Sequence, residues 1–458
     1  MSAQRPNRSF DLGGVRRILA SQVAAAVAAA TLLAGVSTAP VVAAQPLLQN
    51  VPQVGNLTTP PTTSQCLVLF AIHCYQPAQF EKAYDLAPLH SHGIDGRGET
   101  IAIVDSFGSP TIANDLHVFD QTFGLADPPS LKIITPAGPI PAFDPTNSDM
   151  VGWAEETTLD VEWSHVFAPG ANILLVETPV SETEGVTGFP EIVKAENYVI
   201  NHNMADVITQ SFGATENTFP SKQSLLELRS AFVNAYFHHV TVLGSSGDTG
   251  STDYMLNGND LYTFPVNSWP SSDPLVTSIG GTQLTLDDAG NRLAPDVVWN
   301  DGYGAGGGGL SQVFSRPDFQ NSVRKVVDGR RGTPDISMSA AVDGSVVFYF
   351  TFVPGREGFH LVGGTSEASP EFAGIVAMAD QVAHHRLGWI NGRLYDLQYH
   401  HNNGIVDVTL GNNGIGPFTN SDRNTYNVPG YNAGPGYDLA SGLGTIDAAK
   451  FVPELAGH

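Results

Sequence analysis

Short apolar runs that alternate with helix-like segments constrain the fold of this chain more than any other feature of its sequence. The runs are apolar on both faces and cover residues 100–104, 171–176, 205–209, 240–243 and 275–279. Such runs are typical of strands buried inside a parallel sheet. The segments between them, at 113–123, 149–167, 190–203 and 221–238, have helical spacing. The alternation predicts an α/β fold whose parallel sheet is flanked by helices on both faces.

The composition favours a folded, acidic protein. Hydrophobic residues make up 42% of the 458 residues and charged residues 14%, which is enough apolar material for a large core. The formal net charge of −24 excludes nucleic acid as an expected partner. No convincing linker follows residue 66, so we predict a single domain at 66–458. A flexible Pro- and Thr-rich lead-in at 45–65 is expected to precede it.

The first 44 residues have the pattern of a signal peptide. Four arginines and one aspartate precede an apolar, Ala-rich stretch from 23 to 36, and small residues follow up to Ala44. We expect cleavage near Ala44-Gln45, with an uncleaved membrane anchor as the alternative. No later stretch reaches the roughly 18 apolar residues of a membrane span. The sequence thus predicts a secreted or extracellular protein, including one held at the cell envelope, with no membrane span in the mature chain.

Cys66 and Cys74 are the two cysteines of the chain. An exported protein meets an oxidising compartment, where such a pair can form a disulfide. Seven intervening residues do not establish the geometry of a bridge, so two free thiols stay open as the alternative.

Ser366 is the first candidate for chemistry. Gly363-Gly364-Thr365 precede it, and the apolar-periodic segment that follows predicts a helix. A serine at a glycine-led helix N-terminus suits a nucleophile, because the helix dipole favours developing negative charge. The same position equally suits an N-cap, which satisfies free backbone N–H groups.

An acid-rich helical segment at 153–163 offers a base for that serine. Glu156 and Asp160 are four residues apart and therefore share one helix face, whereas Glu155 and Glu162 point elsewhere. Two carboxyls that share a proton have one raised pKa, which suits a general base. A solvated acidic helix face is the structural alternative.

Asp248 lies in a Gly-flanked turn after the expected strand at 240–243. This places it at the carboxyl edge of the sheet, where open α/β sheets carry their sites. A protonated aspartate there can donate a hydrogen bond to an oxyanion. Ordinary turn chemistry is the alternative.

Together these motifs resemble the sedolisin, or serine-carboxyl peptidase, family. Gly364-Thr-Ser366, Glu156-x-x-x-Asp160 and Ser-Gly-Asp248-x-Gly stand in the family's order, and the match extends from about residue 75 to the C-terminus. The resemblance implies a subtilisin-like fold and a serine-type endopeptidase that acts on protein or peptide substrates at acid pH through an acyl-enzyme. It implies Ser366 as nucleophile, Glu156 as base, Asp160 as the group that orients Glu156, and Asp248 as oxyanion donor.

The resemblance also implies residues that contact substrate and a metal ion. Ser211, Phe212 and Gly213 match the family's substrate-binding segment, with Phe212 where members often carry Trp. One Ca²⁺ is expected at a site whose implied ligands are Asp407, Val408, Gly434, Gly436 and Asp438. A shell made only of oxygen ligands suits calcium. Without the resemblance, the Gly-Pro-Gly element at 434–436 would be interpreted as a turn. We expect a monomer.

A subtilisin-type peptidase is the nearest competing interpretation, because Ile103-Val-Asp105-Ser resembles the strand-borne aspartate of such enzymes. They also need a histidine in a His-Gly-Thr-His-like segment, and His117 and His165 have different neighbours. The sedolisin resemblance therefore leaves Asp105 as a strand-end residue without an assigned role.

Two departures from the family's pattern keep a further interpretation open. Glu367 replaces the small residue that usually follows the nucleophile. The family also usually carries a long pro-domain, whereas about twenty residues separate Ala44 from Cys66. These departures support an alternative, a catalytically inactive secreted protein of the same fold that binds peptides.

Overall fold

The predicted parallel sheet is present in the part of the chain that the computed structural model describes, residues 49–50, 57–400 and 403–457. The predicted signal peptide at 1–44 lies outside these residues. The sheet has the strand order β11-β10-β8-β6-β3-β5-β4, with β14 beside β10. All neighbours pair in parallel except β10 and β11. The strands are β3 (Thr100–Ser106), β4 (Leu131–Ile134), β5 (Asn172–Thr178), β6 (Val207–Gln210), β8 (Thr241–Ser245), β10 (Thr277–Gln283), β11 (Val297–Val298) and β14 (Ile336–Ser339).

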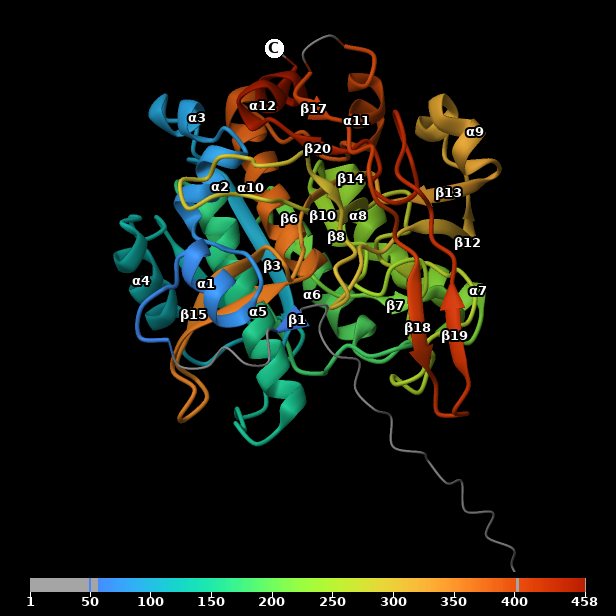
Figure 1. Cartoon of the computed structure of the whole chain (residues 1–458), viewed down its shortest axis with the longest axis horizontal. Coiled ribbons are helices and arrows are strands. Elements are labelled where there is room, and N and C mark those ends of the chain that lie inside the picture. Colours follow the sequence, from blue (N-terminus) through green and yellow to red (C-terminus); the bar gives the residue numbers. More distant parts are fainter. Residues whose placement is uncertain (1–48, 51–56, 401–402, 458) are drawn as a thin grey trace, which may run out of the picture. The chain divides into compact units, whose positions relative to one another are not determined.

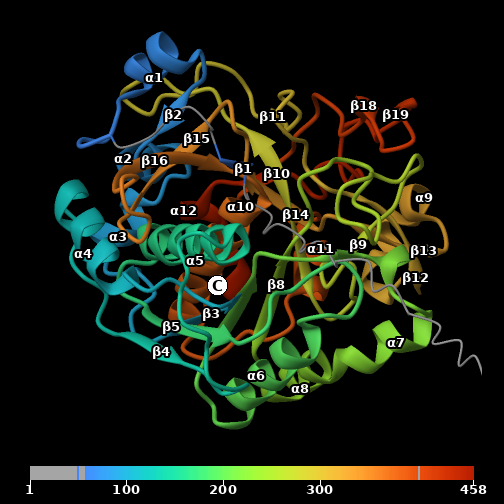
Figure 2. The same ribbon diagram turned by 90° about the horizontal axis from the view of Figure 1, so that it is seen from below.

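Helices cover both faces of this sheet, as the sequence predicted. Figure 2 shows α5 and α10 on one side and α6 and α8 on the other. The expected helix at 221–238 is divided in the structure into α7, a 3-10 turn and α8. The helices are α1 (Thr63–Phe70), α2 (Pro77–Ala83), α3 (Ala87–Ser91), α4 (Ile112–Phe123), α5 (Ser148–Phe167), α6 (Phe189–Asn201), α7 (Lys222–Leu226), α8 (Ser230–His238), α9 (Arg324–Val327), α10 (Thr365–Ala383), α11 (Asn391–Leu397) and α12 (Ala448–Ala456), with 3-10 turns η1 (Glu216–Thr218), η2 (Glu227–Arg229) and η3 (Asp318–Val323).

Alternate residues of β3 enter different cores. Ile101 and Ile103 pack in the larger apolar cluster with α5 and α10, whereas Ala102 and Val104 pack in the cluster with α6 and α8. This follows from the period of two in a strand, which sends successive side chains to opposite faces. Because both faces are covered, β3 is apolar from Ile101 to Val104, and its carboxyl end at Asp105 reaches the site described below.

A second, four-stranded sheet has the order β1-β16-β15-β2, and β16 leads into α10. Figure 2 labels its four strands, and Figure 1 labels β1 and β15 of this sheet. Its strands are β1 (Gln49–Asn50), β2 (Cys74–Tyr75), β15 (Ser345–Phe350) and β16 (Gly358–Gly363). The remaining strands form short two-stranded ribbons: β7 (Ala214–Thr215) with β9 (Ser268–Trp269), β12 (Gly309–Ser315) with β13 (Arg330–Thr333), β17 (Ile405–Val406) with β20 (Thr445–Ile446), and β18 (Ile415–Thr419) with β19 (Thr425–Val428).

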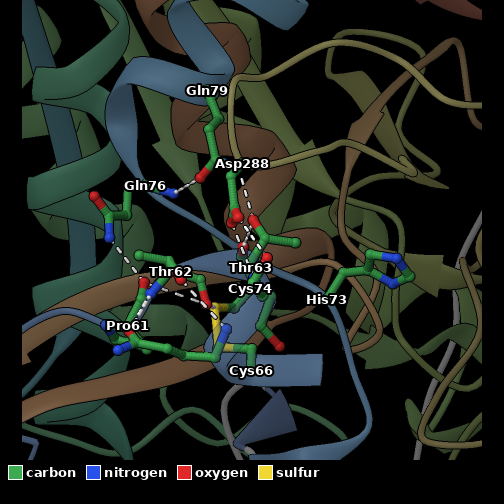
Figure 3. The surroundings of a disulfide bond; sticks show 12 residues. Pro61, Thr62, Thr63, Cys66, His73, Cys74, Gln76, Gln79 and Asp288 are labelled. Carbon is green, nitrogen blue, oxygen red and sulfur yellow. Dashed lines mark hydrogen bonds between the residues drawn. A yellow bond between two sulfur atoms is a disulfide. The ribbon is translucent and has the colours of Figure 1, made fainter. Parts of the chain in front are cut away.

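Cys66 of α1 and Cys74 of β2 are joined in a disulfide, with Cα atoms 5.9 Å apart (Figure 3). Helix α1 begins at Thr63, inside the range assigned to the lead-in, and Thr63 donates a 2.8 Å hydrogen bond to the Cys74 carbonyl. The disulfide therefore ties this helix to the edge of the second sheet. No helix among the described residues is long and apolar enough to cross a membrane.

Candidate active site

Helix α5 carries the predicted base, and the part of the helix that contains the base is buried. It starts where the Asn147 side chain accepts a 3.0 Å hydrogen bond from the Asp149 N–H, a standard N-cap. Every residue from Trp153 to Phe167 is buried. This burial excludes the solvated acidic face that the sequence alone left open.

The structure brings Ser366 next to Glu156. Gly364 is the N-cap of α10, with φ +132°, so Ser366 stands inside the first turn and is not the cap. Its hydroxyl lies close enough to the Glu156 carboxyl to lower that group's pKa. Both side chains are completely buried. The two residues are 210 positions apart in the sequence, and they meet because α5 packs along α10. The nucleophile and base that the resemblance implies are therefore neighbours.

Asp160 is held from two sides. Its Oδ1 accepts a 2.8 Å hydrogen bond from the Ser211 hydroxyl, which follows β6. Glu156, one helical turn earlier, is near enough to lower the pKa of Asp160. The side chain of Asp160 thus has a fixed orientation beneath the base.

Asp105 is a fourth carboxyl of the site, and the sequence left it without a role. It ends the apolar part of β3 and accepts a 2.9 Å hydrogen bond from the Thr157 hydroxyl of α5. Its charge raises the pKa of both Glu156 and Asp160. A strand-end aspartate after a buried run was visible in the sequence, but nothing local linked it to the helix at 149–167.

Burial dominates the electrostatics of this carboxyl cluster, which we define as Asp105, Glu156, Asp160 and Asp248. Desolvation raises the pKa of Glu156 well above its usual value, the charges of Asp160 and Asp105 raise it further, and Ser366 opposes them. Desolvation followed by the charge of Asp105 raises the pKa of Asp160. The pKa of Asp105 rises to about 7, mainly by burial. Like charges this close do not all ionise together, so the cluster retains protons near neutral pH.

Asp248 lies three residues after β8 and faces the start of α10. Its Oδ1 accepts hydrogen bonds from the Thr365 backbone N–H and hydroxyl, both at 2.8 Å. Burial raises its pKa to about 8, and the bonds from Thr365 reduce the shift. Its buried Oδ2 has no hydrogen-bond partner among the described residues. At acid pH this oxygen carries the proton, which makes it a donor beside the residue that precedes Ser366.

The neighbouring acids have structural partners away from Ser366. Glu155 pairs with Arg356 at 3.1 Å, and Glu162 accepts a 3.0 Å bond from the Tyr349 N–H. Glu367 is completely buried and interacts with Ser339 at the end of β14. Burial raises the pKa of Glu367 well above its usual value. The residue after the nucleophile therefore adds no exposed charge to a cleft.

The segment 211–213 is placed at the carboxyl end of β6, next to the site. Phe212 does not line a cleft, because its ring is buried against Trp153 and Phe189, with centroids 6.2 Å away in each case. A side chain at Gly213 would approach the Trp269 carbonyl at 3.2 Å. The Phe212 side chain is thus part of the core, and the Ser211 side chain is bonded to Asp160.

The histidines considered for a subtilisin-type triad lie elsewhere. His117 bonds Asp127 at 2.8 Å, and His165 bonds the Ala126 carbonyl at 2.9 Å. A glutamate thus stands beside the serine where a subtilisin-type site has a histidine.

Comparison with known proteins agrees with this geometry. A model described as "Subtilase family" matches residues 146–400, which include Glu156, Asp248 and all of α10 with Ser366. The chain belongs to the subtilase family. Within it, the chain is of the sedolisin type, as its relatives and its glutamate–serine pair indicate. The chain is 30% identical to kumamolisin of Bacillus sp. (strain MN-32) over 83% of its own length, and 31% identical to sedolisin of Pseudomonas sp. (strain 101) over 82%.

The solved structure of Pseudomonas sedolisin, a serine-carboxyl proteinase complexed with pseudo-iodotyrostatin, matches this sedolisin-type chain with a TM-score of 0.68 and 29% identity. The match covers 83% of this chain and 97% of that one. The subtilisin-like α/β fold is thereby confirmed. The chain spans 63% of the length of the kumamolisin relative and 60% of the sedolisin relative.

The residues expected to bind calcium come together near the C-terminus of this sedolisin-type chain. Asp407 accepts a 2.9 Å bond from the Gly436 N–H, and Asp438 accepts one of 2.9 Å from the Gly434 N–H. Two carboxylates thus flank one turn, and a Cβ added at either glycine would meet no atom within 4 Å. With the nearby Val408 carbonyl, the donor set is all oxygen and fits a hard cation. No group of three or more His, Cys, Asp or Glu residues suited to a metal occurs among the described residues, so carbonyls are needed to complete such a shell.

Proposed function

We propose that this chain is a secreted serine-carboxyl endopeptidase that cleaves protein or peptide substrates at acid pH through an acyl-enzyme on Ser366. The observation that supports it most is the buried contact of Ser366 with Glu156, because a serine hydroxyl needs an adjacent base to become a nucleophile. The names of the sedolisin and kumamolisin relatives and the signal-peptide pattern agree with the proposal.

Glu156 and Asp160 work as a pair that shares one proton and carries one negative charge. Glu156 acts as the base in the form in which the proton lies on Asp160, which donates it toward Glu156 because Ser211 already occupies the Asp160 Oδ1. Asp248 keeps its proton on Oδ2, because Oδ1 is the acceptor for Thr365. A desolvated carboxylate is a stronger base than one in water, so the raised pKa of Glu156 helps it to take the serine proton.

In the first step Glu156 takes the Ser366 proton as Oγ bonds to the peptide carbonyl carbon. The oxyanion that forms accepts a hydrogen bond from the Asp248 Oδ2–H. Glu156 then gives the proton to the departing nitrogen as the C–N bond breaks, which leaves an ester on Ser366. A water molecule attacks the ester after losing a proton to Glu156, and that proton returns to Oγ as the acid product leaves.

One Ca²⁺ held by Asp407, Asp438 and the carbonyls of Val408, Gly434 and Gly436 would stabilise the fold. When bound, the ion supplies charge neutralisation for the two carboxylates at this turn. It has no part in bond breaking. The ion would attach the C-terminal turn at 434–438 to the segment that follows β17.

An activity profile from pH 3 to 8 on a denatured protein substrate tests the proposal. We expect Ser366→Ala and Glu156→Gln to lose about 10⁴-fold or more in kcat/KM, as in other serine nucleophile sites. Ser369→Ala is the matched control, because Ser369 lies on the same helix and bonds Thr209 at 2.8 Å instead of Glu156. The control loses one neutral hydrogen bond and keeps its activity within about tenfold. Unchanged cleavage by either site variant would refute the assignment, and absence of cleavage at every pH would refute the enzyme.

A further inference from the structure

A cavity of about 160 Å³ lies beside the carboxyl cluster, and none of the roles above uses it. Its walls are mainly apolar and come from the loop after β3, the segment at 140–143 and the start of α5: Phe107, Pro110, Ile140, Pro141, Phe143 and Met150. Glu177 of β5 is its acidic lining residue. We call this cavity the Glu177 pocket.

Glu177 is a half-buried carboxyl without a cation. It forms no ion pair or side-chain hydrogen bond with the residues that the structure describes, and burial raises its pKa to about 7. The Glu177 side chain fits here because residue 108 is a glycine. A Cβ on Gly108, whose φ is +75°, would lie 2.0 Å from Glu177 Oε1. A half-buried carboxyl that lines a cavity and has no cation beside it is available to pair with a basic group that enters from outside.

The Glu177 pocket is close to the reaction centre. Glu177 is the register partner of Asp105 across the β3–β5 pair, and its charge raises the pKa of Asp105. Met150 precedes Glu156 by six residues on α5, which is about 9 Å along the helix. An extended peptide covers that distance in roughly three residues. A side chain near the scissile bond can therefore reach the pocket.

We propose that the Glu177 pocket is a substrate subsite that binds a lysine or arginine side chain. The apolar walls pack on the aliphatic stem, and the Glu177 carboxylate pairs with the cationic head. A cation bound beside Glu177 lowers the pKa of that carboxyl, so the group stays ionised in the complex at a pH below 7. This inference rests on the proposed peptidase function and adds its substrate class.

Matched peptides that differ at one position, arginine against citrulline, test the subsite. Citrulline has nearly the same shape as arginine and is neutral. With arginine placed in turn at each position around the scissile bond, we expect one position at which the wild-type protein favours arginine by about 10- to 100-fold in kcat/KM, the range of a hydrogen bond between charged groups. Glu177→Gln should bring that ratio close to 1. The ratio is the readout because Glu177 also influences Asp105 and thus the overall rate.

Glu227→Gln is the charge-matched control, since it removes one exposed acid on the 3-10 turn η2 and should leave the ratio unchanged. A wild-type ratio near 1 at every position, or a preference that survives Glu177→Gln, would overturn the subsite while leaving the peptidase intact. If no peptide is cleaved, the proposed function fails, and the subsite is then tested by binding. Fluorescence anisotropy of the same peptides, carrying a fluorescent label, measures their affinity for Ser366→Ala and for the double variant Ser366→Ala with Glu177→Gln. Equal binding of the arginine and citrulline peptides would then refute the subsite.

Discussion

Asp248→Asn separates the proton on Asp248 from the shape of its side chain. Asparagine keeps an Oδ1 that accepts both bonds from Thr365, and it places an amide where the acid has its proton. The asparagine side chain at position 248 is neutral at every pH, whereas the Asp248 side chain of the wild type is neutral only while it is protonated. Comparing the two proteins therefore measures the cost of charging this one buried group.

The direction of the effect follows from the raised pKa. The folded protein holds the Asp248 proton up to about pH 8, whereas the unfolded chain releases it near pH 3.8. The contribution of protonated Asp248 to the free energy of unfolding is thus complete below the pKa that this group has in the unfolded chain. It is lost as the pH rises through the pKa that the group has in the folded protein. Each pKa unit corresponds to about 1.4 kcal/mol, so wild type loses up to about 4 kcal/mol by pH 7 from this group. Water that reaches the ionised carboxylate reduces the loss, which makes this figure an upper limit.

Urea unfolding at pH 4, 5.5 and 7 measures the effect as a change in the free energy of unfolding. We expect Asp248→Asn to resemble wild type at pH 4 and to exceed it by an amount that grows toward pH 7. Asp396→Asn, at an exposed position of α11, serves as the control and should give a difference that does not change with pH. If wild type and Asp248→Asn lost stability in parallel between pH 4 and 7, the protonated, desolvated Asp248 would be refuted.

Three further outcomes follow from other parts of the structure. Asp105→Asn removes a charge that raises the pKa of Glu156, so the acid limb of the pH profile of kcat/KM should move to lower pH; an unmoved limb would disconnect Asp105 from the base. Replacing Cys66 with serine opens the small loop that fastens α1 to β2 and should cost about 2–3 kcal/mol of unfolding free energy in urea titrations, and an equal value for both proteins would contradict a stabilising disulfide. A calcium chelator at pH 6 should lower the melting temperature of wild type but not that of Asp438→Ala, and a chelator without effect on wild type would argue against a bound ion.

The parallel sheet could be predicted because its signal is local. Each of the five predicted runs forms a strand, with ends displaced by a few residues; the run at 100–104 continues to Ser106 as β3. The helix predicted at 221–238 shows the limit of this reasoning. Its apolar spacing continues through residues 227–229, but the chain tightens there into a 3-10 turn, where Arg229 pairs with Asp273, 44 residues away.

The order of motifs along the chain led to the family, and the four-residue spacing put Glu156 and Asp160 on one helix face. Sequence spacing does not tell which acids of that helix meet the serine and which meet Arg356 or a backbone N–H. That choice depends on how α5 packs against α10 and against the ends of β3 and β6.

The local pattern of residues determined the strands, the helices and the chemical groups available to them, because backbone conformation responds to near neighbours. The tertiary structure alone decided that Asp105 joins the carboxyl cluster, that Phe212 packs inward, and that Glu177 lines a cavity without a cation. Desolvation and charge interactions act through space, and they depend on which distant segments the fold brings together.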